Sequence, residues 1–310
     1  MKAVRYHSYG DSDVLVYEEA DHPVAGAGQV VVKVAGAAFN PLDVAIRAGF
    51  VQQLFPVAFP HIPNYDVAGV ITEAGEGVSG WSAGDPVVAF LPMTAPGAAA
   101  EYAVAPAQAL AAAPRAVELA DAAALPSAGL TAWQSLFEHA SLKAGQSILV
   151  NGAGGAVGGY AVQLARQAGA TVTATVSERS LDRIRSYGAD RIIDHTATPL
   201  PQAVAGQQFD VVLNLVRTSP EETAELAGLA ADGGAFVSTT FPDFDDAGRG
   251  VRTVKVFSRS DAAQLAELVA RVDAGDLQIE VAERRPLTDL AAVHDEAVAG
   301  RLAGKTVLIP

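Results

Sequence analysis

The sequence of 310 residues contains no cysteine, which excludes disulfide bonds, iron–sulfur clusters and zinc sites built from thiolates. Its six histidines are scattered, and no pair of them has a spacing typical of metal ligands. No apolar run approaches the length of a membrane span, and the first residues, MKAVRYHSYGDSD, lack the apolar core of a signal peptide. We therefore expect a cytoplasmic protein that holds no metal and does not enter a membrane.

Positive charge is also scarce, because 21 Lys and Arg residues stand against 35 Asp and Glu residues and give a formal net charge of −14. An acidic surface repels phosphate backbones, so nucleic-acid binding is not expected. Half of the residues are hydrophobic, which supplies a sizeable core, and the length suggests two domains. These properties agree with an intracellular enzyme that acts on a small molecule.

The most informative segment runs from Ser147 to Ala170, SILVNGAGGAVGGYAVQLARQAGA. Its apolar run Ile148–Val150 meets a glycine cluster, which opens directly into an amphipathic, alanine-rich stretch. A strand, a tight glycine turn and a helix in this order are typical of dinucleotide binding, because the turn lets a pyrophosphate approach the main chain and the helix directs free N–H groups at it. We predict that the chain binds a nicotinamide or flavin nucleotide.

The glycine spacing is compatible with two alignments of this motif. Ala153, Gly155 and Gly158 fit a 1-3-6 spacing with alanine first, and Gly152 with the same two glycines fits a looser 1-4-7 spacing. A glycine-rich turn can also be purely structural, but the second strand-like run, Thr171–Val176, supplies the context that the motif requires.

The residues after Val176 bear on the choice between NAD and NADP, because an acidic side chain there would bind the ribose 2′-hydroxyl of NAD. Ser177 and Arg179 follow instead, and Arg183 lies one helical turn further on. A hydroxyl and guanidinium groups suit the 2′-phosphate of NADP, although the arginines could also form a solvated helix start. Glu178 favours NAD unless it points to solvent. We predict NADP(H).

Two regions of different character divide the chain. Residues 1 to about 115 contain short strand-like runs separated by glycine and proline, which predicts a compact, mostly β domain. From about Asp121 strand-like and helical runs alternate, which predicts a doubly wound parallel sheet of six strands and an α/β fold. We predict one domain from residues 1–115 and 259–310 and a nucleotide-binding domain from residues 116–258. The six strand-like runs are Ser147–Val150, Thr171–Val176, Arg191–Ile193, Phe209–Leu215, Ala235–Ser238 and Thr253–Phe257.

Seven segments, in their order along the chain, resemble the zinc-independent medium-chain dehydrogenases/reductases of the quinone oxidoreductase (zeta-crystallin-like) family. They are 37–49 (AAFNPLDVAIRAG), 63–70 (PNYDVAGV), 83–88 (AGDPVV), 125–133 (LPSAGLTAW), 145–158, 187–190 (YGAD) and 304–309 (GKTVLI). The resemblance implies a GroES-like, mostly β catalytic domain built from both chain ends, which encloses a Rossmann domain. It also implies a homodimer that pairs at the edge of the Rossmann sheet near Thr253–Ser258.

Zinc-dependent relatives of this family carry a cysteine ligand near Phe39-Asn40 and a His-Glu pair at the position of Tyr65-Asp66. Without those imidazole and thiolate ligands a catalytic zinc has no site in this chain. We therefore predict that NADPH passes a hydride directly to a quinone or another conjugated enone.

The resemblance also assigns roles to single residues. Asn40 and Thr131 are expected beside the nicotinamide and its ribose, with Asp43 nearby, although Asn40 could simply cap a helix and Thr131 could be an ordinary helix-start hydroxyl. The residues expected to bind the rest of the cofactor are Gly155, Ala156, Val157 and Gly158 at the pyrophosphate, Ser177 and Arg179 at the 2′-phosphate, His195 near the adenosine, and Val216, Thr239 and Thr240 near the carboxamide.

Several positions depart from the family pattern. Arg217 stands where glycine is usual, and it could narrow the cofactor site, contact the substrate or point to solvent. Asn214 replaces a common acidic residue, and Ala45 replaces a tyrosine, so no proton donor is evident. Quinone reduction tolerates that loss better than enoyl thioester reduction does.

An apolar loop, residues 50–60 (FVQQLFPVAFP), follows the Asn40 segment. Phe50, Phe55 and Phe59 could line a pocket for a flat hydrophobic substrate, or could pack the core of the first domain. Two other functions stay open: a reductase dedicated to one biosynthetic enone, and an NADPH-binding protein without catalytic activity.

Overall fold

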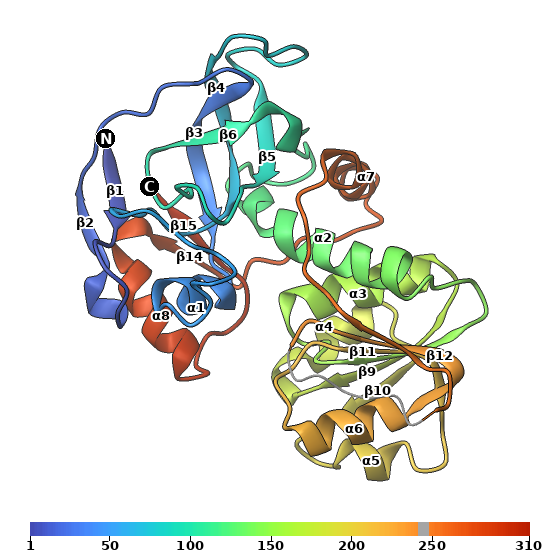
Figure 1. Ribbon diagram of the computed structural model, residues 1–310. Coiled ribbons are helices and arrows are strands. Elements are labelled where there is room, and N and C mark those ends of the chain that lie inside the picture. Colours follow the sequence, from blue (N-terminus) through green and yellow to red (C-terminus); the bar gives the residue numbers. More distant parts are fainter. Residues whose placement is uncertain (241–247) are drawn as a thin grey trace. The chain divides into compact units, whose positions relative to one another are not determined.

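The computed structural model describes residues 1–240 and 248–310, and the chain folds into two compact units (Figure 1). The first unit consists of Met1–Ser127 and Ser260–Pro310, and the second consists of Ala128–Arg259. The chain enters the second unit within helix α2, Pro126–Trp133.

The first unit is built on a seven-stranded sheet in the order β14-β15-β3-β4-β5-β7, with β6 also paired to β3. The sequence of this region predicts strands at Gln29–Val34, Val67–Ala74, Asp85–Leu91 and Glu101–Val104, and these four runs overlap β3, β4, β5 and β6 in turn. A separate two-stranded ribbon pairs β1 with β2. The strands of this unit are β1 Lys2–Arg5, β2 Val16–Glu19, β3 Gln29–Ala38, β4 Asp66–Ala74, β5 Pro86–Phe90, β6 Tyr102–Pro106, β7 Leu110–Ala112, β14 Glu283–Pro286 and β15 Thr306–Ile309.

Three further helices belong to the first unit: α1 (Pro41–Arg47), α7 (Ala262–Asp273) and α8 (Leu290–Val298). Helix α8 buries Leu290 and Val293 in a core cluster with Leu308 of β15 and Phe39. The C-terminal segment therefore packs into the same core as the residues that follow β3.

The second unit contains the predicted doubly wound parallel sheet, with six strands in the order β10-β9-β8-β11-β12-β13. In Figure 1 helices α3 and α4 cover one face of this sheet, and α5 and α6 cover the other. Helices on both faces bury the middle residues of the central strands β8 and β11, which explains the apolar runs Ile148–Val150 and Val211–Leu213. The elements are β8 Ser147–Asn151, α3 Ala156–Gln167, β9 Thr171–Val176, α4 Leu181–Ser186, β10 Arg191–Asp194, α5 Leu200–Ala203, β11 Phe209–Asn214, α6 Pro220–Gly228, β12 Ala230–Ser238 and β13 Arg252–Lys255.

The sequence did not indicate strands β1, β2, β7 and β14. Strand β2 is largely exposed and polar, and β7 consists of Leu110 and two alanines, which have low strand propensity. Within the described ranges 1–240 and 248–310, no helix has the length and apolar character needed to cross a bilayer.

Candidate active site

The glycine turn of the second unit connects β8 to α3. Gly152 has φ +92° and donates its N–H to Thr175 Oγ1 at 2.9 Å, and the Gly155 N–H donates to the Gly152 carbonyl at 3.2 Å. A Cβ atom on Gly158 would lie only 2.4 Å from the Gly152 carbonyl oxygen. Gly152 and Gly158 are thus the positions that require glycine, which favours the 1-4-7 alignment over the one that begins at Ala153.

The N-terminus of α3 fits a phosphate group. Gly155 occupies the cap position without a side-chain capping bond, and a Cβ there would meet only the Gly152 carbonyl oxygen, at 3.6 Å. The first N–H groups of a helix lack intrahelical partners and carry its positive dipole end. Ala156 and Val157 therefore present N–H donors at an open surface beside Gly155, whose missing side chain leaves room for the pyrophosphate that the sequence predicts here.

Arg183 and Arg179 have different surroundings. Arg183 donates from Nη2 to the Gly154 carbonyl at 2.6 Å, which ties α4 to the glycine turn. Arg179 is exposed and has no hydrogen-bond or ion-pair partner among the described residues. Exposed His195 donates its N–H to the Val176 carbonyl at 3.0 Å, so it lies at the strand end that leads to Ser177. Glu178 is exposed as well.

The residues expected near the carboxamide gather around Asn214, which is completely buried. Its Oδ1 accepts from Asn151 Nδ2 at 3.0 Å, and its Nδ2 donates to the Val216 carbonyl at 3.1 Å. Thr240 Oγ1 donates to the same carbonyl at 2.8 Å, and the Thr239 N–H donates to the Asn214 carbonyl at 3.1 Å. A carboxylate could not donate to Val216, so an amide at position 214 explains the departure from the acidic residue.

Two other predicted positions of the second unit are at least partly exposed. Thr131 lies on α2 and is partly exposed. Arg217 is exposed and has no partner among the residues that the structure describes.

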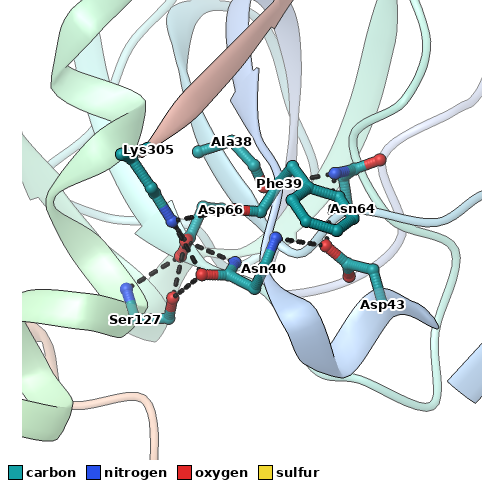
Figure 2. A network of polar contacts seen from close by, with 8 residues as sticks. All are labelled: Ala38, Phe39, Asn40, Asp43, Asn64, Asp66, Ser127 and Lys305. Atoms are coloured by element: carbon teal, nitrogen blue, oxygen red, sulfur yellow. Dashed lines mark hydrogen bonds and ion pairs between the residues drawn. The ribbon is translucent and has the colours of Figure 1, made fainter. Parts of the chain in front are cut away.

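In the first unit, the buried polar network consists of Asn40, Asp66, Ser127 and Lys305 (Figure 2). Asp66 Oδ2 accepts from Asn40 Nδ2 at 2.9 Å and from Ser127 Oγ at 2.6 Å, and Oδ1 accepts from the Ser127 N–H at 2.8 Å. Lys305 Nζ donates to Asn40 Oδ1 at 2.7 Å and lies 3.3 Å from Asp66 Oδ2. The remaining Lys305 donor reaches the Phe39 carbonyl at 3.2 Å.

Strand register explains why these distant residues meet. Ala38, the last residue of β3, pairs with Asp66 of β4 on one side and with Val307 of β15 on the other. Asn40 follows β3 and Lys305 precedes β15, so both side chains lie at the end of the same strand. A buried ion pair with every donor used in this way avoids the cost of an unpaired charge.

Asp43 lies in the first turn of α1 and is 1 % exposed. Its Oδ2 accepts from the Asn40 backbone N–H at 2.7 Å and from Asn64 Nδ2 at 3.3 Å, while its buried Oδ1 has no partner. Burial raises the pKa of this carboxyl to about 7, and the Asp66 carboxylate adds to the rise. Asn40 does begin the helix, but its side-chain amide bonds to Asp66 and Lys305.

Tyr65 occupies the position of the zinc-binding histidine of zinc-dependent relatives. Its hydroxyl lies 2.9 Å from His61 Nε2, and burial lowers the pKa of His61 to about 4. Among the described residues, no group of three or more His, Cys, Asp or Glu side chains could hold a metal ion.

The aromatic residues of the apolar loop differ in exposure. Phe50 is 80 % exposed, so it does not pack in the core, and Phe55 is partly buried. Phe59 is 41 % exposed and packs edge-on against Tyr6 and Tyr9, with ring centroids 5.7 and 5.0 Å apart.

The sequence singled out Asn40 and Asp43 but gave no role to Asp66, Ser127 or Lys305. The available signal was a charged residue directly before a mostly apolar run, as in Asp66 before Val67–Ile71 and Lys305 before Thr306–Ile309. Such a charge is buried only when it is paired.

Residues 26–115 match the alcohol dehydrogenase GroES-like domain family, and residues 187–308 match a family described as zinc-binding dehydrogenase. A chloroplast envelope quinone oxidoreductase homolog of Arabidopsis thaliana is 33 % identical over 330 residues, which cover 100 % of this chain and 98 % of that protein. An NADPH-dependent alkenal/one oxidoreductase of the same plant is 39 % identical over 70 % of this chain and 57 % of its own. The solved quinone oxidoreductase from Coxiella burnetii superposes with a TM-score of 0.89 at 26 % identity, covering 100 % of this chain and 99 % of that one. The match to residues 26–115 identifies the sheet of the first unit as GroES-like.

Proposed function

Because this chain belongs to the quinone oxidoreductase family of the medium-chain dehydrogenases/reductases, we propose that it transfers a hydride from NADPH to a quinone or another conjugated enone without zinc. One observation is the main support for a mechanism without zinc. The Asp66 carboxylate, at the position of a glutamate in zinc-dependent relatives, is bound by the Lys305 ammonium, Asn40 and Ser127. A carboxylate with these partners leaves no vacancy for a metal, and the neighbouring Tyr65 is no zinc ligand of the usual kind.

A reduced nicotinamide, when bound, supplies the two electrons and one proton of the hydride, and water supplies the second proton of the product. The donors at the start of α3 would hold the pyrophosphate. The chain's own contribution is to orient the reactants and to stabilise the charge that develops on the acceptor oxygen.

The preference for NADP rests on Arg179 and Ser177, since a guanidinium without another partner is available for a 2′-phosphate. Arg183 already donates to Gly154, so we assign it to the shape of the turn. The name of the alkenal/one reductase also mentions NADPH, which supports the same choice.

Replacing Arg179 with alanine is expected to raise KM for NADPH about 10-fold or more and to leave KM for NADH within about 2-fold, because only NADPH carries the 2′-phosphate. Steady-state kinetics with both cofactors at a fixed quinone concentration measures this. Arg185→Ala is the matched control, because Arg185 lies on α4 and pairs with Asp182. Equal effects of Arg179→Ala on both cofactors would show that the 2′-phosphate lies elsewhere.

The activity itself is tested by following NADPH and NADH oxidation with 1,4-benzoquinone, 9,10-phenanthrenequinone, an alkyl enone and crotonyl-CoA. Turnover with a quinone or enone that prefers NADPH is the expected result. Turnover with crotonyl-CoA alone would favour a dedicated enoyl reductase, and tight NADPH binding without any turnover would favour a binding role.

Pairing into a homodimer and a cytoplasmic location stay predictions. The sheet order supports the first, because β13 is an edge strand and Phe257 beyond it is 51 % exposed.

A further inference from the structure

The amide of Asn40 lies between a group that can only donate and a group that accepts when ionised. On one side the Lys305 ammonium is 2.7 Å from Oδ1, and on the other the Asp66 carboxylate is 2.9 Å from Nδ2. Ammonium nitrogen has no lone pair to accept a hydrogen bond, and an ionised carboxylate has no proton to donate. The chemistry of the two neighbours therefore permits only one orientation of this amide.

This orientation restricts what Asn40 offers to a ligand. Its oxygen faces Lys305 and lies 3.3 Å from Ser127 Oγ, whose single proton goes to Asp66 at 2.6 Å. One hydrogen on Nδ2 is donated to Asp66, and no described residue accepts the second. Because Asn40 is only partly buried, it meets a ligand as a donor of one hydrogen bond.

We propose that Lys305 is a positioning residue, which holds the Asn40 amide so that its free N–H donates to the carbonyl oxygen of the quinone or enone. The inference rests on the proposed function. For an enone, the hydride forms a C–H bond at the β-carbon, the electrons of the C=C bond shift toward the carbonyl carbon, and the C=O electron pair moves onto oxygen. Water then protonates the resulting enolate. A fixed donor stabilises that oxygen more in the transition state than in the ground state.

The ammonium also strengthens the donor electrostatically. Lys305 is 7 % exposed and Asp66 is fully buried, so their charges act through a medium of low dielectric constant. The Lys305 ammonium, 2.7 Å from the amide oxygen, polarises the amide and makes its N–H a better donor. Asp66 balances the charge, which keeps the pair tolerable inside the protein.

The test must separate positioning from folding. Lys305→Met alone leaves the Asp66 carboxylate unpaired, so the informative variant combines Lys305→Met with Asp66→Asn and removes both charges. Asn40→Ala removes the donor, and Lys305→Arg keeps a cationic donor. A triple variant combines Lys305→Met, Asp66→Asn and Asn40→Ala. Circular dichroism and thermal unfolding identify the variants that are folded.

In the folded neutral pair, kcat with a quinone or enone is expected to fall about 100-fold, as it does in Asn40→Ala. The triple variant is expected to be no slower than Asn40→Ala, because Lys305 acts through Asn40. Lys305→Arg should retain at least about a tenth of the wild-type kcat, and the dissociation constant for NADPH, measured by fluorescence, should change less than about 3-fold. A further readout is the pKa of bound 4-nitrophenol. The wild type should lower this pKa relative to the neutral pair and to Asn40→Ala.

Independent, multiplicative losses of kcat in the triple variant would overturn the proposal. A weaker NADPH affinity in the neutral pair and in Asn40→Ala, with kcat unchanged, would also overturn it, because the donor would then serve the cofactor. Wild-type turnover in the same assay tests the proposed function separately, and its absence with every acceptor would remove the basis of both.

Discussion

Gly158→Ala is expected to raise the dissociation constant for NADPH at least about 10-fold and to destabilise the second unit by about 1–3 kcal/mol. The added Cβ would lie 2.4 Å from the Gly152 carbonyl oxygen and 2.5 Å from Ala153 Cα, and both are backbone atoms that cannot rotate away. Helix α3 must therefore move away from the glycine turn, which displaces the N–H groups that face the phosphate. Fluorescence titration with NADPH and chemical denaturation measure the two effects.

Gly228→Ala is the matched control in the same unit. Gly228 is the last residue of α6, is exposed, and has no heavy atom within 4 Å of an added Cβ. Alanine there should leave NADPH affinity unchanged and stabilise the helix by up to about 1 kcal/mol. If Gly158→Ala behaves like this control, the close approach of α3 to the turn does not shape the nucleotide site.

Asp43→Asn is expected to stabilise the protein at pH 8 and to have little effect near pH 4. Burial raises the pKa of Asp43 from 3.8 to about 7, so the folded state keeps a proton that the unfolded state loses. Between these two values the folded state binds more protons, and stability falls as the pH rises until the folded-state pKa is passed. The difference of about three pKa units corresponds to a loss of stability of about 4 kcal/mol relative to low pH, and the loss is complete above pH 7.

Urea denaturation of the wild type and Asp43→Asn at several pH values between 4 and 8 measures this difference. Asparagine preserves an oxygen that can accept from the Asn40 N–H and from Asn64, so the helix start is retained. Asp21→Asn is the control, because Asp21 is an exposed carboxylate without a partner among the described residues. Parallel stability curves for the wild type and Asp43→Asn would contradict a neutral Asp43 in the folded protein.

The sequence predicted the second unit best, because its signals are local. The run Thr171–Val176 coincides with β9, since its β-branched residues favour a strand and the run lies between Gly169-Ala170 and the polar residues that begin at Ser177. Strand β12 begins at Ala230, earlier than the predicted Ala235, because Asp232 and two glycines interrupt its apolar pattern. Strand β13 ends at Lys255, before the exposed Phe257.

The candidate site was predictable only in part. The Asn-Pro-Leu-Asp motif identified Asn40 and Asp43, but the partners of Asn40 depend on strand pairing between distant segments. Asp66 and Lys305 are 239 residues apart, and only the position of β3 between β4 and β15 brings them together. The same limit applies to Gly152, whose positive φ decided between two spacings that the letters alone left equal.

The position of Lys305 after the second unit has a consequence for synthesis on the ribosome. Asp66 emerges early, whereas its counter-charge emerges only after all of residues 128–259 have been translated. During that interval the second unit can fold from its own contiguous segment, while the start of β4 holds a carboxylate that is costly to bury. A nascent chain released before residue 305 would keep this part of the first unit open and recognisable to proteases and chaperones, so the ion pair couples closure of the early strands to translation of a late one.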